Sequence, residues 1–167
     1  MRRASFSGMN CSIAAALEVV GEWWSLLIVR EAFLGARRFE EFQEHLGIAR
    51  NILTTRLRAL VESGVLERVR YEKRPQRFEY RLTEKGRALF PAIVALMAWG
   101  DRWGPNRRGP PVLLVHRDTQ RAVEPVLVDG GTGRPIEASG VRAVPGPGAT
   151  DATRRRLQAR DRARRGS

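Results

Sequence analysis

The spacing of apolar and polar positions changes period along the chain, and it predicts helices first and a pair of strands afterwards. A helical period runs through residues 11–20 and resumes over 23–33 after Gly21. Two shorter helical patterns follow at 39–46 and 48–60, separated by a single glycine. The first 60 residues therefore predict four helices, of which the last two are joined by a tight turn.

From residue 65 onward the period shortens to two. Valines and a tyrosine alternate with charged residues up to Tyr71, and Phe78, Tyr80 and Leu82 alternate in the same way. This alternation of β-branched and aromatic residues is typical of strands. The polar connection EKRPQR contains Pro75, which a hairpin tip tolerates because no ladder hydrogen bond is needed there. Helix, turn, helix and then a basic-tipped hairpin is the order of a winged helix-turn-helix.

A long apolar helix is predicted after the hairpin, with Thr83 as its N-cap and a kink or late start at Pro91. It carries more apolar surface than a small winged domain needs. We expect the excess to pair with a second subunit. The residues expected at this homodimer interface are Leu89, Ile93, Leu96, Met97, Trp99 and Trp103.

The fold expected for the whole chain is mainly α with a small β wing, and it has three parts. Residues 1–104 form the winged helix-turn-helix with its dimerisation helices. Residues 105–148 begin with a Gly/Pro-rich linker and continue as a small β-rich appendage. Residues 149–167 are polar and arginine-rich, and we expect this tail to be disordered, with a helix over 153–165 on DNA as the alternative.

The net charge of +12 favours an anionic partner, with nucleic acid ahead of a membrane surface. The charge is unevenly distributed, however. Residues 1–104 contain 17 basic and 12 acidic residues, and residues 151–167 alone contain seven arginines and two aspartates. Much of the excess therefore lies in the tail, which is expected to add non-specific affinity for DNA. Specific recognition has to come from the geometry of the folded part.

The second helix of the motif has the pattern of a DNA-reading helix. Leu53, Leu57 and Leu60 fall on one side of it, and the opposite side carries Asn51 and Thr55. Asn can bind adenine through two hydrogen bonds, and a Thr methyl can contact a thymine methyl. Arginines on this helix, before it and on the wing are expected mainly at phosphates. The candidate DNA contacts are Arg38, Arg50, Asn51, Thr54, Thr55, Arg56, Arg58, Lys73, Arg74 and Arg77.

These segments together resemble the HxlR-type transcriptional regulators, bacterial winged helix-turn-helix proteins related to the MarR group. The resemblance covers about residues 9–103 and rests on an N-terminal Cys, Gly-x-Trp-Trp, Leu-x-x-Arg-Glu, Arg-Arg-Phe, Leu-Thr-x-Arg-Leu and Tyr-x-Leu-Thr-x-x-Gly in that order. It implies a homodimer joined through N- and C-terminal helices, an operator with two half-sites, and DNA contacts in 50–58 and 72–77. Ala49 departs from the family, which usually has a small polar cap there.

Cys11 is the single cysteine, so an intramolecular disulfide is excluded and a reducing cytoplasm fits. It matches a position that is a thiol sensor in some family members, and a helix start would stabilise its thiolate. The alternative is a small buried apolar residue. Catalytic groupings, metal sites and cofactors are not indicated, since His116 alone cannot build a metal site in the appendage. The apolar runs are also too short to span a membrane.

The function predicted from the sequence is a cytoplasmic, non-enzymatic regulator. It would bind an inverted-repeat site in double-stranded DNA as a homodimer and act as a repressor. Two alternatives stay open. One is a module that responds to a redox signal, a small molecule or an electrophile through Cys11. The other is a non-specific nucleic-acid-binding protein that works through charge alone.

Overall fold

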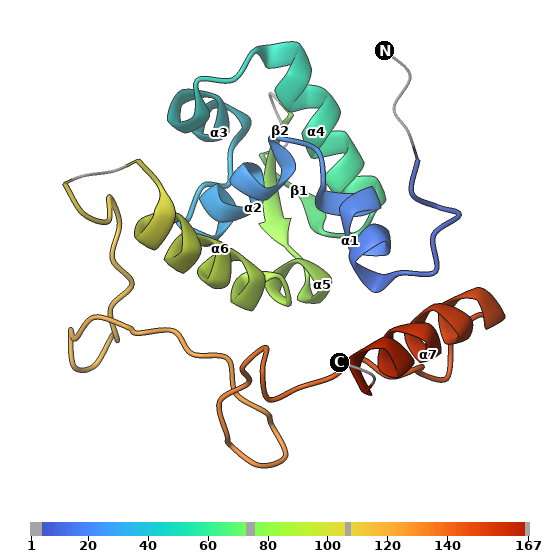
Figure 1. Cartoon of the computed structure of the whole chain (residues 1–167). Coiled ribbons are helices and arrows are strands. Elements are labelled where there is room, and N and C mark those ends of the chain that lie inside the picture. Colours follow the sequence, from blue (N-terminus) through green and yellow to red (C-terminus); the bar gives the residue numbers. More distant parts are fainter. Residues whose placement is uncertain (1–4, 73–75, 106–107, 166–167) are drawn as a thin grey trace. The chain divides into compact units, whose positions relative to one another are not determined.

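A computed structural model describes residues 5–72, 76–105 and 108–165 of the chain (Figure 1). They form two compact units. The first contains Ile13–Val112, and the second combines Gly8–Ser12 with the chain from Leu113 onward. The expected class, mainly helical with a small two-stranded wing, is confirmed by the order of the elements in the first unit.

Helix α2 (Ser25–Phe33) lies at the centre of the first unit and contacts α3, α4, α6 and β2. Figure 1 shows it surrounded by these elements. Its Ile28 and Val29 are fully buried, and they join Phe42 of α3 in the same core. Burying such side chains stabilises the fold by roughly 1.5–3 kcal/mol each. This core holds the helix-turn-helix and the wing in place.

The helix-turn-helix consists of α3 (Phe39–Leu46) and α4 (Arg50–Glu62). Gly47 ends α3 in the left-handed conformation, with φ 60°, which a residue without Cβ adopts at little cost. The predicted turn is therefore confirmed. His45, near the end of α3, binds the buried carboxylate of Glu31 through Nδ1 at 3.1 Å, so α3 is also tied to α2.

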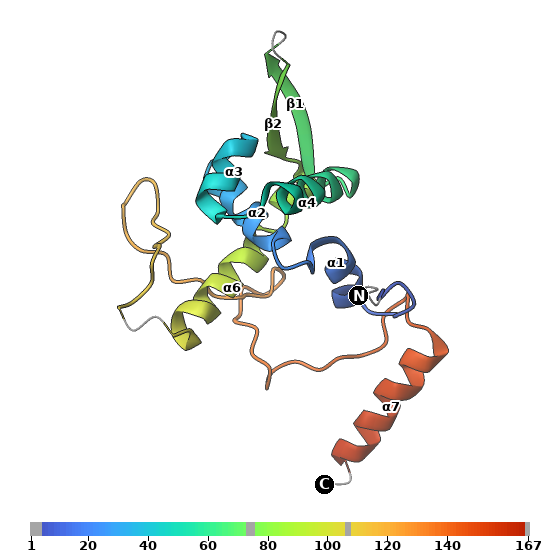
Figure 2. The same ribbon diagram turned by 90° about the horizontal axis from the view of Figure 1, so that it is seen from above.

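The wing is the antiparallel pair β1 (Leu66–Glu72) and β2 (Arg77–Leu82), in which Arg68 pairs with Tyr80. Figure 2 shows the two strands projecting away from the helices. Leu66 is buried at the base of the hairpin, while most of the strand residues above it are at least partly exposed. Burial at one end alone explains why the hairpin projects from the core.

Two helices follow the wing where the sequence predicted one long helix with a kink or late start. They are α5 (Glu84–Arg87) and α6 (Phe90–Trp103), and Pro91 lies in the first turn of α6. Proline is accepted there because its missing N–H has no helical partner to lose. The Thr83 cap is confirmed, since its Oγ1 accepts a hydrogen bond from the Gly86 amide at 3.1 Å. Helix α1 (Ser12–Val20) precedes all of these elements.

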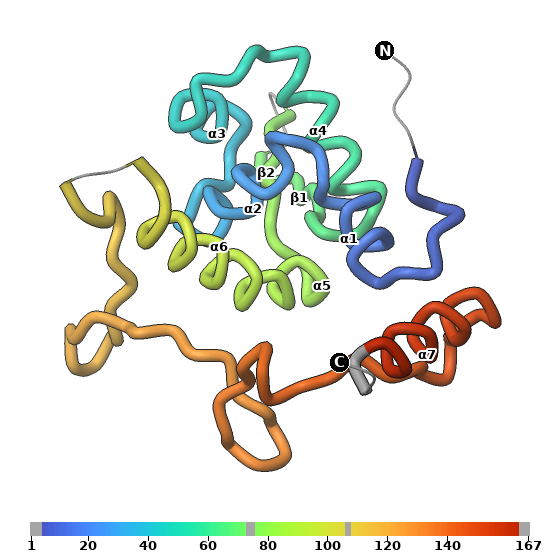
Figure 3. The backbone as a smooth tube through the Cα atoms, in the orientation of Figure 1, coloured from blue at the N-terminus to red at the C-terminus, as the bar shows by residue number. Residues whose placement is uncertain are grey.

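The second unit differs from the predicted β-rich appendage. The tube in Figure 3 follows a long irregular course between α6 and α7. Its described part contains two isolated bridges, Val115 to Ala122 and Val128 to Pro135, in place of strands. Proline has no amide to extend a ladder, and apolar residues such as Leu127 remain exposed. The segment has too little buried surface to hold a sheet together.

The tail also differs from prediction, because Asp151–Arg165 form helix α7 and not a disordered segment. Arginine is a good helix former, and Asp151 places a negative charge in the positive first turn. Thr150 caps the helix, with its Oγ1 accepting from the Thr153 amide at 3.3 Å. The expectation of disorder rested on the high charge of this segment. The cap from Thr150 and the helix propensity of arginine favour a helix instead.

No single helix in the described part of the chain is long and apolar enough to cross a membrane. Helices α1 and α2 reach the required length and apolarity only when they are counted together, and they are bent by 78° at their junction.

Candidate nucleic-acid interface

Helix α4 has the two faces that the sequence predicted. Leu53, Leu57 and Leu60 are completely or almost completely buried, whereas Asn51 and Thr55 are exposed on the other side. The Thr55 hydroxyl donates to the Asn51 carbonyl at 2.9 Å, the bond typical of threonine within a helix. Because that bond occupies the hydroxyl, the side chain offers mainly its methyl group to the surroundings. Thr54 makes the same kind of bond to Arg50, at 2.8 Å.

The start of α4 is uncapped by a side chain, as the sequence indicated. Ala49 is the N-cap residue in an extended conformation, and it has no side chain to accept a hydrogen bond. An uncapped start costs roughly 1 kcal/mol relative to a serine or aspartate cap. The backbone N–H groups in the first turn of α4 therefore point outward, and Ala49 has no side-chain atom to accept a hydrogen bond from them. Such a helix start, with its positive dipole end, is suited to binding a phosphate.

An open groove of about 680 Å³ lies between α3, the start of α4 and the wing. Arginines, glutamates and aromatic rings line it together. Its lining residues are Arg38, Phe39, Glu40, Glu41, Glu44, Arg50, Arg68, Tyr71, Gln76, Arg77, Phe78 and Tyr80. Three of the predicted DNA contacts, Arg38, Arg50 and Arg77, are thereby brought to one groove. Lys73 and Arg74 lie outside the described residues.

Aromatic rings hold two of these guanidinium groups in place. The Arg38 guanidinium carbon lies 4.9 Å from the centre of the Tyr71 ring, and that of Arg50 lies 4.7 Å from the Phe39 ring. Stacking on a ring fixes the guanidinium plane while its N–H edge stays available for an anion. Each pair also joins two parts of the motif. Arg38 precedes α3 and Tyr71 lies on the wing, while Arg50 lies in α4 and Phe39 in α3.

Arg68 is a further candidate that the sequence did not single out. Its guanidinium carbon lies 3.5 Å from the centre of the Phe78 ring, across the hairpin, and it lines the same groove. The alternation of β1 placed Arg68 on one face of the strand, but the pairing with β2 was needed to put an aromatic ring beside it.

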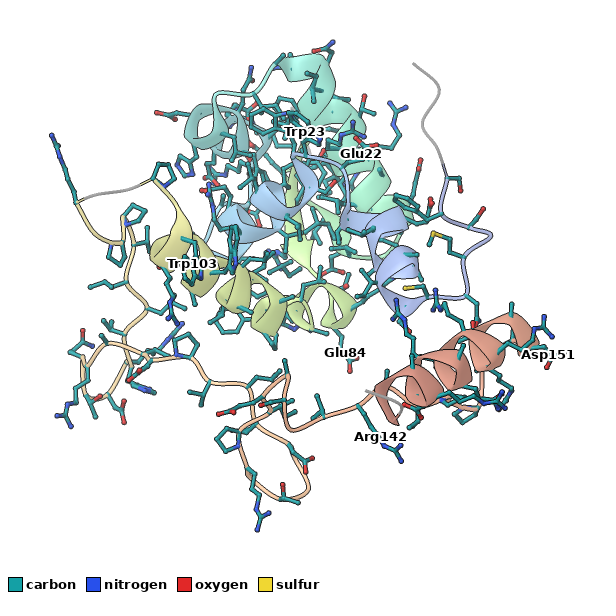
Figure 4. The ribbon with its side chains drawn as sticks, viewed as in Figure 1. Glu22, Trp23, Glu84, Trp103, Arg142 and Asp151 are labelled. Carbon is teal, nitrogen blue, oxygen red and sulfur yellow. The ribbon has the colours of Figure 1, made fainter. Side chains whose placement is uncertain are left out.

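Arg56 is placed differently from the other predicted contacts. Its guanidinium lies 2.6 Å from the Glu22 carboxylate, in the connection between α1 and α2, and both side chains are about three-quarters buried. Glu22 lies next to α4 in Figure 4. In this structure Arg56 therefore ties α4 to the connection between α1 and α2. Contact with phosphate, as the sequence predicted, would require this ion pair to open.

Glu41 fixes the approach to α3 and therefore the position of Arg38. Its Oε2 accepts hydrogen bonds from the amides of Arg37 and Arg38, at 2.7 and 3.0 Å. The Arg37 carbonyl in turn accepts from the Tyr80 amide at 2.7 Å, which joins this segment to the wing. These two hydrogen bonds hold the pKa of Glu41 below its ordinary value of 4.5, and the one from the Arg37 amide has the larger effect.

A Glu41→Gln variant is expected to be about 1 kcal/mol less stable than the natural protein at pH 7. Folding lowers the pKa of Glu41, so the ionised side chain stabilises the folded protein. This stabilisation is fully present above the pKa of Glu41 in the unfolded chain, and it is lost as the pH falls through the pKa in the folded protein. The stability difference should therefore narrow as the pH falls through the folded pKa of Glu41. Denaturant unfolding at pH 7 and pH 3 measures it, with the exposed neighbour Glu40→Gln as the control. A gap that persists unchanged at pH 3 would contradict this assignment.

The residues predicted at a dimer interface divide into two groups in α6. Ile93 is buried within the core of the same chain, and Leu89 and Met97 pack against that core. Leu96, Trp99 and Trp103 are 52%, 65% and 65% exposed. Figure 4 shows Trp103 at the end of α6. Of the residues predicted at the interface, the exposed ones therefore form a stripe of Leu96, Trp99 and Trp103.

Cys11 and the two tryptophans of the Gly-x-Trp-Trp motif have mixed surroundings. Cys11 is exposed directly before α1, which agrees with a position near a helix start and not with a buried apolar residue. Trp23 is 91% exposed, whereas Trp24 packs against the core. In the described part of the chain, no group of three or more His, Cys, Asp or Glu side chains comes together as a metal site.

Comparison with known proteins agrees with this geometry. A model of the HxlR-like helix-turn-helix family matches residues 19–108. An HTH-type transcriptional regulator of Mycobacterium tuberculosis is 51% identical over 137 residues, which make up 82% of this chain and 87% of the relative. The crystal structure of PA1607, a candidate transcription factor, has a TM-score of 0.76 and 46% identity, covering 84% of this chain and 98% of that one.

The redox regulator HypR in its reduced form is a further structural relative. It has a TM-score of 0.52 and 32% identity, and the match covers 55% of this chain and 92% of HypR. The curated relative is named as a transcriptional regulator, and the family as a helix-turn-helix family. The family match covers the central helix, the helix-turn-helix, the wing and α6. With its winged architecture and these relatives, the chain belongs to the HxlR-like helix-turn-helix family of DNA-binding transcriptional regulators.

Proposed function

We propose that this regulator is a homodimeric repressor that recognises an inverted-repeat operator through α4 and the wing. The observation that carries the proposal is the pair of faces on α4, in which a fully buried leucine side supports an exposed side with Asn51 and Thr55. A helix anchored in this way can enter a major groove without changing its own packing.

Base reading is assigned to Asn51 and Thr55, which are exposed on α4, and the exposed Arg58 of the same helix is assigned to a phosphate. Asn51 has the chemistry for adenine, while the Thr55 methyl suits a thymine methyl. The stacked arginines, Arg38 and Arg50, are assigned to phosphates, because their planes are fixed by rings at the side of the groove.

Dimerisation is assigned to the exposed stripe of α6 together with α1. Ile13 and Leu17 of α1 are 71% and 37% exposed, so this helix also presents apolar surface. Several large apolar side chains exposed along a helix usually mark an interface. Two copies related by a two-fold axis would present two copies of α4, which matches an operator made of two inverted half-sites.

Selecting duplexes from a random pool with the purified protein tests this proposal directly. The expected product is a palindromic motif whose half-site centres are about one helical turn apart. A non-palindromic motif would contradict the dimeric mode. Recovery of no motif would favour the alternative in which the protein binds nucleic acid through charge alone. In vitro transcription from a promoter containing the selected site then distinguishes repression from activation.

A second candidate function, control by thiol chemistry, is favoured by the exposure of Cys11. HypR, which is described as a redox regulator, shares the fold with this chain. With one cysteine per chain, the oxidised form would be an intersubunit disulfide or an adduct with a small thiol. Diamide treatment is expected to change operator affinity in the natural protein and to leave a Cys11→Ser variant unchanged. Equal responses from the two proteins would exclude Cys11 as the sensor.

A further inference from the structure

Helix α7 is attached to the rest of the second unit along a single face. Thr153, Leu157 and Asp161 are four residues apart and are the half-buried positions among the described side chains of the helix. The Thr153 hydroxyl donates to Asn10 Oδ1 at 2.8 Å, and Asp161 lies 3.6 Å from Arg142. Leu157 lines a small hollow shared with the preceding segment. Figure 4 shows Arg142 beside the helix.

The start of α7 is held by Asn10, which is about 140 residues away in the sequence. Its Oδ1 accepts from the Thr150 amide at 3.1 Å, in addition to the Thr153 bond, and its Nδ2 donates to the Gly148 carbonyl at 3.1 Å. One amide side chain therefore satisfies three groups at the beginning of the helix. The arginines of α7 are consequently presented on a fixed scaffold.

The face opposite this attachment presents two aligned arginines. At about 100° per residue, Arg155 and Arg162 are about 140–160° from Leu157 and two turns apart. Both are exposed, and neither makes an ion pair among the residues that the structure describes. Exposed arginines also lie at positions 154 and 156, whereas Arg160 lines the hollow on the attached side.

We propose that the outer face of α7 is a second contact of this protein with the phosphate backbone of double-stranded DNA. The proposal rests on the DNA-binding function proposed above. Duplex DNA carries a phosphate charge about every 1.7 Å of its axis, and arginine binds phosphate with a planar pair of donors. The contact is independent of base sequence, because guanidinium groups on phosphates read no base edges.

The test compares two double variants of the full chain that lose the same charge. R155Q/R162Q changes the outer face of α7 and keeps helix propensity, since glutamine is also a good helix former. R117Q/R121Q removes two exposed arginines from the irregular part of the same unit. Fluorescence anisotropy gives the affinity for the selected operator and for a random duplex of equal length, at several salt concentrations.

R155Q/R162Q is expected to lower the slope of log affinity against log salt by about 1.8 for each bound subunit, because each lost phosphate contact contributes about 0.9. Both duplexes should be affected equally, and R117Q/R121Q should retain the natural slope. Equal slopes in the two variants, or an unchanged slope in R155Q/R162Q, would overturn the proposal. So would a larger effect of R155Q/R162Q on binding to phosphatidylglycerol vesicles than to DNA. Lack of operator preference in all the proteins would instead contradict the proposed specific function, while the slopes would remain informative.

Discussion

Replacing Leu96 and Trp99 with glutamate is expected to convert the protein into a monomer and to weaken its binding to a two-half-site operator about a hundredfold. Both side chains are more than half exposed, so the fold of the single chain should survive the change. Charges placed on the proposed interface would be desolvated in a dimer, at a large cost in free energy. The second half-site would then no longer benefit from the high effective concentration that a dimer provides.

Sedimentation velocity and operator titration measure these two effects. V126E/L127E is a matched control, because it also replaces two exposed apolar residues by glutamate, in the second unit. It accounts for the weaker DNA binding that any two added negative charges cause. The natural protein should prefer a two-half-site duplex to a single half-site, and L96E/W99E should lose that preference. A variant that still sediments as a dimer would place the interface elsewhere.

The second large effect is expected at the reading face of α4. Asn51→Ala together with Thr55→Ala should cost roughly 1–3 kcal/mol of discrimination for each base contact that is lost, in each half-site. Binding to random duplex should be nearly unchanged. Alanine is the best helix former, and neither side chain contributes to the buried leucine face, so α4 itself should remain folded.

Arg50→Gln provides the contrast for this double variant. Arg50 is assigned to a phosphate, so its loss should weaken operator and random duplex alike and lower the salt slope by about 0.9 for each half-site. Competition titrations with both duplexes distinguish the two classes of residue. If N51A/T55A weakened both duplexes equally, Asn51 and Thr55 would not be base readers.

The first unit could be predicted well because its main signals are local. The periods of 3.6 and 2 identify helices and strands from a few neighbouring residues, and Gly47 marks the turn because only a short list of residues adopts its conformation easily. The buried leucines of α4 follow from the same periodicity. The lack of a side-chain cap at the start of α4 could also be predicted, because Ala49 has no side-chain acceptor.

The roles of individual arginines could not be read in this way. Arg56 and Arg58 are two residues apart on the same helix, yet Arg56 is paired with Glu22 and Arg58 is exposed. The ion pair depends on how the α1–α2 connection packs against α4, which periodicity does not describe. The stacking of Arg68 on Phe78 likewise depends on the pairing of two strands.

The sequence by itself determined the order of the elements from α1 through the wing, the buried and exposed faces of α4, and the family. These are properties of short segments, and neighbouring residues suffice to specify them. Tertiary structure alone decided which apolar residues of α6 are buried and which remain exposed, and that Arg56 faces Glu22. It also decided that Asn10 holds the start of α7. Each of these depends on contacts between residues far apart in the chain, whose free energies become available only when the elements pack together.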